Sequence, residues 1–263
     1  MVKFYFVFLI IFFLIVYPSK VRGGESASVP AFQWQIGEQL QYKVKWAFIR
    51  LGTLTMHVKD TIRYNGKSLY QVILKIDSNP KLFFVDMHNQ YESYIDDQFT
   101  IHRHISTEKE DGNPFFADHR FNYEDSTVYL KMTDPQNHRQ MIEKQLPMHT
   151  KLFDGITMAF YSRANASQTM SDTLTTFILE NRGLVEINFS GQEQMVEVEA
   201  LTKPVSSYYI DGQINVEGIA GVTGPFKGWF AANQTRPPLQ AKLKVFIGHV
   251  TVELEDYNVL PKN

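Results

Sequence analysis

Alternation of apolar and polar side chains constrains the fold of this chain more than any other feature. It is clearest in a seven-residue run whose apolar members are Leu40, Tyr42, Val44 and Trp46. Successive side chains of a strand point to opposite faces, so these four predict one buried face of a half-buried strand. Lys43 and Lys45 fall on the other face, which we expect to be exposed to solvent.

Turn sequences recur at short intervals after this strand. Asn65-Gly66 is a strong hairpin signal, so residues 53–63 and 68–77 are predicted to pair. Further strands are predicted at residues 89–95, 99–106, 117–123, 127–132, 173–180, 184–189, 193–203, 210–217, 226–232, 239–246 and 249–257. This pattern predicts a mainly β protein, an antiparallel barrel-like or strongly curved sheet, with a β-sandwich as the alternative.

One segment departs from the β pattern. Ile156, Ala159, Phe160 and Arg163 are spaced as on one face of a helix, and Asp154 is suited to cap its first turn. We therefore predict one short helix near residues 154–164. The sequence contains no internal repeat or linker, which predicts a single β-rich domain over residues 32–260 after a small-residue lead-in at residues 24–31.

The N-terminus has the three-part layout of a signal peptide. Lys3 is followed by fourteen residues, Phe4–Tyr17, that carry no charge, and Val21 and Gly23 fit the positions before a cleavage site. The apolar run is shorter than the roughly 20 residues of a membrane-spanning helix. We predict that residues 1–23 are a cleaved signal peptide, giving a periplasmic or secreted protein without a transmembrane span. An uncleaved anchor in the inner membrane is the alternative.

Composition narrows the classes of function. The chain has 26 basic and 28 acidic residues, and loss of Lys3, Lys20 and Arg22 with the signal peptide leaves a formal charge of −5. This balance gives no reason to expect nucleic acid as a partner. The chain has no cysteine, which excludes a thiol nucleophile and suits a bacterial periplasmic protein that is stable without disulfides.

Catalytic and metal-binding motifs are weak. No serine lies in a Gly-x-Ser-x-Gly elbow, and the acid pairs fall in turns. His102 and His104 share a strand face and could bind a metal with help from His88, Glu92 or His119. We instead interpret them as a solvated strand face, and we assign no catalytic residue, metal or cofactor; an enzyme is the less favoured reading.

Several stretches together resemble the bacterial domain of unknown function 3108 family, over roughly residues 32–257. They are Gly37-Glu38 with the alternating strand to Trp46, then Ile49 and Gly52; Leu152–Arg163; Trp229-Phe230; Arg236-Pro237-Pro238; Gly248; and Glu253–Tyr257. The resemblance implies an exported, envelope-associated β protein and no particular chemistry. The chain departs from the family at Ala231-Ala232-Asn233, where a polar or acidic pair is common, which argues against a carboxylate site there.

Aromatic residues are abundant on the predicted strands and suggest a binding surface. Trp46, Tyr91 and Trp229 are candidates for the wall of an apolar cavity, and Arg163 for an anchor to an anionic head group. The alternatives are core packing of the aromatic rings and pairing of Arg163 with an acid or with the helix C-terminus.

These observations favour a non-enzymatic periplasmic or envelope protein. It would bind a hydrophobic or amphipathic, lipid-like ligand, or aid envelope assembly with a protein partner. Two other classes stay open, a hydrolase of an envelope polymer and a structural partner of an outer-membrane complex.

Overall fold

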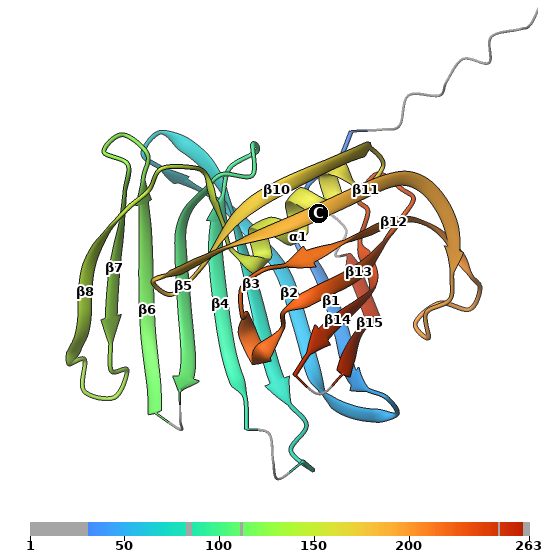
Figure 1. Cartoon of the computed structure of the whole chain (residues 1–263), viewed down its shortest axis with the longest axis horizontal. Helices are drawn as coiled ribbons and strands as arrows, with labels where there is room; N and C mark the ends of the chain where they lie inside the picture. Colours follow the sequence, from blue (N-terminus) through green and yellow to red (C-terminus); the bar gives the residue numbers. More distant parts are fainter. Residues whose placement is uncertain (1–30, 83–85, 111–112, 247, 260–263) are drawn as a thin grey trace, which may run out of the picture.

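The computed structural model describes residues 31–82, 86–110, 113–246 and 248–259 (Figure 1). The predicted signal peptide, residues 1–23, and residues 24–30 of the lead-in lie outside this part of the chain. The described helices comprise α1 (Gly155–Asn165) and the short 3-10 helix η1 (Ile219–Gly221). None of the helices in the described ranges is long and apolar enough to cross a bilayer.

Fifteen strands form one continuous sheet, in the order β8-β7-β6-β5-β4-β3-β2-β1-β15-β14-β13-β12-β11-β10-β9. The strands are β1 (Glu38–Trp46), β2 (Ile49–Tyr64), β3 (Lys67–Ser78), β4 (His88–Ile95), β5 (Ile101–Glu110), β6 (Asn113–Asn122), β7 (Thr127–Thr133), β8 (Gln140–Pro147), β9 (Leu152–Phe153), β10 (Thr169–Ile178), β11 (Asn181–Val196), β12 (Val205–Ile214), β13 (Gly224–Ala231), β14 (Pro238–Val245) and β15 (Gly248–Val259). Every neighbouring pair is antiparallel except β9 with β10. The predicted mainly β, curved antiparallel sheet with one short α-helix is therefore confirmed.

The sheet curls back on itself without closing. Figure 1 shows β10 and β11 running obliquely across the face of the sheet formed by the middle strands. The tip of this hairpin reaches β8 at the other edge, where Lys144 pairs with Glu180 and Arg182 donates to the carbonyl of Pro147. Inside, the rings of Phe121 and Phe177 lie 5.0 Å apart. Side chains thus bridge the gap between the two edges of the barrel-like sheet.

Most predicted elements are present, and the differences concern β8, β9 and the predicted strand at residues 193–203. The two-residue strand β9 was not predicted. The hairpin at Asn65-Gly66 is confirmed, because Tyr64 and Lys67 are register partners in β2 and β3. β8 was not predicted; it is an edge strand with mostly exposed, polar side chains, so it lacks a buried alternating face. The predicted strand at residues 193–203 is wrong, because β11 continues to Val196 and residues 197–204 form a connection.

The outer face of β1 differs from the prediction. Leu40 and Tyr42 are buried as expected, but Lys43 is only 6% exposed. The Glu253 carboxylate lies 3.2 Å from the Lys43 ammonium. Glu199, in the connection between β11 and β12, forms a second ion pair with Lys43. The acid that covers Lys43 is 156 residues distant in the chain, so strand periodicity could not reveal it.

Helix α1 lies within the curl and is fixed at both ends. At its start the Asp154 Oδ1 accepts from the backbone N–H of Thr157 at 2.7 Å, which confirms the predicted cap. Near its end Arg163 is 0% exposed and makes a two-bond ion pair with Glu38 of β1, at 2.7 and 2.9 Å. The ion pair of Arg163 therefore fixes the end of the helix to β1.

A candidate ligand-binding cavity

A cavity of about 750 Å³ lies between the two halves of the curled sheet. Strands β1 to β6 supply one wall and strands β10 to β15 the other, and α1 contributes residues such as Met158, Ala159 and Ser162. Most lining side chains are aliphatic or aromatic; they include Val44, Leu54, Leu74, Ile76, Met158, Val185, Ile187, Ile210, Phe226, Phe230, Leu243, Val250 and Val252. This size and lining are typical of pockets that enclose small apolar ligands.

Stacked aromatic rings that do not line the cavity pack against α1. Trp34 stacks on Phe160 of α1 at 4.3 Å and on Tyr70 of β3 at 4.1 Å, and Phe32 packs edge-on against Trp34. The guanidinium of Arg163 lies 4.8 Å from the Phe160 ring centre. These contacts fill the space between α1 and the N-terminal segment.

The cavity opens to solvent at one of its ends. Phe246, at the tip of the β14–β15 hairpin, lines the cavity and is nevertheless 96% exposed. Val44 and Trp46, which we expected to be buried, are only half-buried because they line the cavity near this end. This mouth lies at the end of the sheet where the β1–β2 and β14–β15 turns lie (Figure 1).

A polar cluster interrupts the apolar wall beside α1. His104 of β5 holds the Asp154 carboxylate through its Nδ1 at 2.6 Å, and Ser93 of β4 also hydrogen-bonds to Asp154. Burial alone would raise the pKa of Asp154, but hydrogen bonds from His104, Ser93 and Thr157 hold it below its ordinary value. The cap of the helix is thus an ionised carboxylate in the cavity wall.

Several buried polar atoms near the cavity have no hydrogen-bond partner among the described residues, and two of them belong to His119 of β6 and Ser106 of β5. His119 of β6, the register partner of His104, uses its Nε2 to donate to the Leu179 carbonyl at 3.0 Å. Its Nδ1 is then a bare acceptor, and burial, with His104 as a second cause, lowers the pKa of His119 to about 4. Among the described residues, neither this Nδ1 nor the Oγ of Ser106 has a hydrogen-bond partner.

The charged groups of the cavity wall are mostly acidic. Its described lining residues include three acids, Asp77, Glu108 and Asp154, and one lysine, Lys227. Glu108 accepts a hydrogen bond of 2.8 Å from Tyr91, and burial, followed by this carboxylate, raises the Tyr91 pKa. A ligand anion would therefore meet like charges in the interior.

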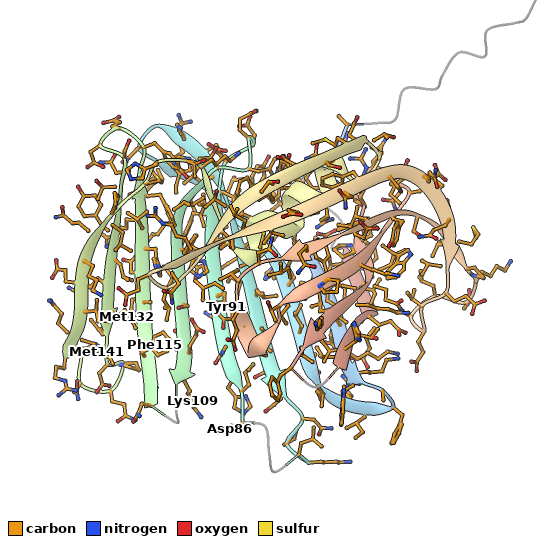
Figure 2. All side chains as sticks on the ribbon, in the orientation of Figure 1. Asp86, Tyr91, Lys109, Phe115, Met132 and Met141 are labelled. Carbon is orange, nitrogen blue, oxygen red and sulfur yellow. The ribbon has the colours of Figure 1, made fainter. Side chains whose placement is uncertain are left out.

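The four candidate binding residues fall into two groups. Trp46 and Tyr91 both line the cavity, with Tyr91 on β4 as Figure 2 shows. Trp229 lies between Gly228 and Phe230, which face the cavity, so its own side chain points to the opposite face of β13. There the centre of its ring lies 5.5 Å from that of Tyr209. Arg163 is buried against Glu38, which matches the alternative of pairing with an acid. We leave these last two residues out of the candidate site.

The histidine pair differs from the solvated face that we expected. His102 and His104 are both buried, and His102 bonds to Asp96 at 3.0 Å. Within the described ranges no group of three or more His, Asp or Glu residues is placed to hold a metal ion. Ser93 and Asp154 both approach the Nδ1 of His104, whereas a serine–histidine–acid relay uses opposite ring nitrogens.

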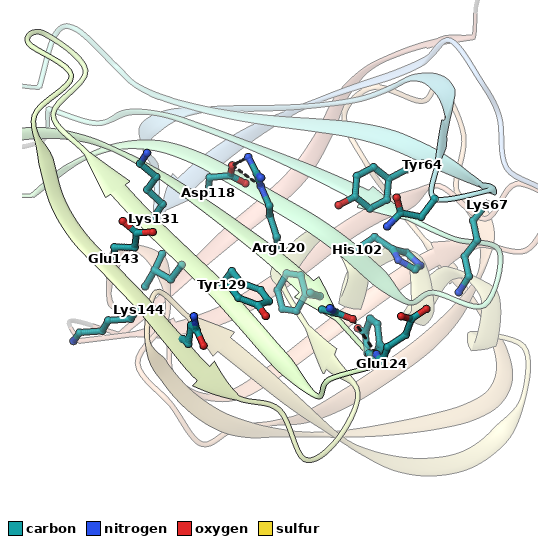
Figure 3. A pocket seen from close by; sticks show the side chains of 16 residues that line it. Tyr64, Lys67, His102, Asp118, Arg120, Glu124, Tyr129, Lys131, Glu143 and Lys144 are labelled. Carbon is teal, nitrogen blue, oxygen red and sulfur yellow. Dashed lines mark hydrogen bonds and ion pairs between the residues drawn. The ribbon is translucent and has the colours of Figure 1, made fainter.

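A second, polar depression of about 730 Å³ lies on the sheet near β6, β7 and β8 (Figure 3). Its main feature is Asp118, which Arg103 holds through two bonds of 2.8 and 2.9 Å and Arg120 through two more. Burial opposes ionisation of Asp118, but the two guanidinium groups hold its pKa below the ordinary value. Its central charges are already paired, so we favour the apolar cavity as the functional site.

Comparison with known sequences identifies a family. The DUF3108 family, described as a protein of unknown function, matches residues 41–255. No curated protein sequence gives a significant match.

Two solved structures are similar to the chain. A beta-barrel-like protein of domain of unknown function DUF1849 from Brucella abortus has a TM-score of 0.57 and 10% identity, covering 87% of this chain and 100% of that one. A Bacteroides fragilis protein, named as a suspected exported protein with a YmcC-like fold, has a TM-score of 0.35 and 13% identity, covering 88% and 99%. The first likeness supports the barrel-like fold.

Proposed function

Because this chain belongs to the DUF3108 family of proteins of unknown function, we propose a role from its own geometry: it binds one apolar or amphipathic molecule inside the curled sheet. The observation that carries this proposal is the cavity of about 750 Å³, which has a mostly apolar wall and opens to solvent beside Phe246. An empty pocket of this kind leaves aliphatic side chains in contact with water, and an apolar ligand would remove that contact. Trp46 and Tyr91 belong to the proposed binding wall.

The polar groups favour an uncharged head group. The bare Nδ1 of His119 needs a donor, and Ser106 beside it can donate or accept. A hydroxyl group does both, whereas a carboxylate would offer no proton to His119 and would be repelled by Asp154 and Glu108. We therefore expect a chain or ring system that ends in a hydroxyl group.

Export is part of this proposal and rests on the N-terminal sequence. A chain with a cleaved signal peptide at residues 1–23 would act in the periplasm or outside the cell. Residues 32–260 would then act as one binding domain, either as a carrier of its ligand or as an assembly factor.

A displacement assay tests the proposal. Phenylnaphthylamine, a neutral apolar dye, should gain fluorescence on binding to the purified protein. A long-chain alcohol should displace the dye at lower concentration than the fatty acid of the same length at neutral pH. If the acid competes better, the assignment of an uncharged head group is wrong.

The matched variants locate the site. Ala159→Phe adds a ring to the face of α1 that lines the cavity and should abolish dye binding without unfolding the sheet. Ala200→Phe makes the same change in the exposed connection between β11 and β12, at a residue that does not line the cavity, and should leave binding intact. Equal binding by both variants and the unaltered protein would mean that the dye binds elsewhere.

A further inference from the structure

Two phenylalanines project almost fully into solvent at the mouth of the cavity. Phe48, in the β1–β2 turn, is 92% exposed, and Phe246, in the β14–β15 turn, is 96% exposed. Exposure of two large aromatic side chains is costly in water, and clustered apolar groups on a surface mark a site of interaction.

Sheet pairing places the two turns together. β1 and β15 are neighbours, and Trp46, which ends β1, is the register partner of Val250 near the start of β15. The β1–β2 and β14–β15 turns therefore lie side by side at one end of the sheet, as Figure 1 shows. Since Phe246 also lines the cavity, this apolar tip borders its entrance.

Lysines flank the apolar tip. Lys227 of β13, which also borders the cavity, and Lys242 of β14 are exposed register partners, so two like charges face each other on adjacent strands. Lys244, two residues before Phe246, is also exposed. Asp211 is opposite Lys227 on β12, where it accepts from Asn188, so the lysines outnumber the acid. A surface of opposite charge would relieve their repulsion.

We propose that Phe48 and Phe246 insert into the surface of a lipid bilayer while Lys227, Lys242 and Lys244 contact its anionic head groups. Apolar insertion combined with a basic flank is the pairing that holds peripheral proteins on membranes. The cavity mouth then faces the hydrocarbon, so an apolar ligand passes between bilayer and cavity without crossing water. This passage of ligand rests on the proposed function, whereas docking on the bilayer does not.

Vesicle flotation tests the docking. The mature protein should float with vesicles of equal parts phosphatidylcholine and phosphatidylglycerol, and much less with phosphatidylcholine alone. Phe48→Ser with Phe246→Ser should lower the affinity by about tenfold or more. Lys242→Glu with Lys244→Glu should lower it by at least tenfold, with about fivefold expected for each lysine charge removed.

Matched controls lie on the far edge of the sheet. Met141→Ser removes an exposed apolar side chain of β8 (Figure 2), and Lys131→Glu reverses a charge on β7. Both should float like the unaltered protein. Equal flotation of all variants, or no flotation of the unaltered protein, would overturn the proposal. So would a stable dimer that becomes a monomer in the Phe48→Ser, Phe246→Ser variant, because a second copy would then cover the tips.

The dye assay separates this proposal from the cavity function. The Phe48→Ser variant, whose altered side chain does not line the cavity, should bind phenylnaphthylamine normally in solution, and Ala159→Phe should float normally. If the unaltered protein floats with vesicles but does not bind the dye, the cavity function is refuted and membrane docking is still supported.

Discussion

The ion pair between Arg163 and Glu38 gives the sharpest test of the architecture. Both side chains are essentially unexposed, and Arg163 also donates to the carbonyl groups of Thr235 and Arg236. Removing one partner leaves the other charge buried without compensation, which costs about 3–5 kcal/mol. We therefore expect Arg163→Met and Glu38→Leu each to lower the free energy of unfolding by about 4 kcal/mol.

The stability of the double variant shows whether the two charges interact in the folded protein. It buries no charge, and its remaining cost is the loss of hydrogen bonds to two carbonyl groups, about 2 kcal/mol. Arg163→Met with Glu38→Leu should thus be more stable than either single variant, as measured by urea unfolding followed by tryptophan fluorescence. Trp34, which stacks on Phe160 beside Arg163, should report the transition.

A surface pair provides the control. Lys144 and Glu180 are both more than a third exposed, and Lys144→Met should cost less than about 1 kcal/mol. Single-variant costs that simply add in the double variant would show that Arg163 and Glu38 do not interact in the folded protein. If Arg163→Met lost dye binding while fully folded, Arg163 would belong to the ligand site after all.

Three further predictions follow from the cavity wall. The pKa of His119 is about 4 in the folded protein, below the ordinary 6.5, so between these two pH values the unfolded chain binds one proton more than the folded chain. The free energy of unfolding should therefore fall by about 3 kcal/mol as the pH drops from above 6.5 to 4. His119→Gln should flatten this part of an acid titration, and an unchanged slope would refute the assignment to His119. Trp46→Ala should cost about 1–2 kcal/mol, less than a core tryptophan, because the ring is half-buried, and it should weaken dye binding; a loss of 4 kcal/mol would identify a core residue. Ser106→Ala should weaken binding of a long-chain alcohol and leave that of an alkane unchanged, as measured by dye displacement; equal losses for both would exclude a hydrogen bond from Ser106.

Local patterns predicted much of the fold. Period-2 alternation identified β1, the Asn65-Gly66 turn identified the β2–β3 hairpin, and Asp154 identified the start of α1. Each of these signals lies within a few consecutive residues, where strand pleat, turn geometry or helix capping acts directly.

Long-range contacts were beyond such patterns. Lys43 is buried by Glu199, and Arg163 by Glu38, in both cases through partners more than a hundred residues away. The His102-x-His104 pattern was visible, but the partners that decide its role, Asp96 and Asp154, required the three-dimensional fold. Abundant aromatic residues indicated an apolar interior, and only the curl of the sheet determined which of them line the cavity.

Native mass spectrometry of protein purified from its own source shows whether the cavity holds an apolar molecule. We expect a population heavier than the bare mature chain by the mass of one small apolar compound, released on unfolding and absent from the Ala159→Phe variant prepared in the same way. A mass equal to that of the bare chain, together with no binding of long-chain alcohols added in excess, would refute binding in the cavity.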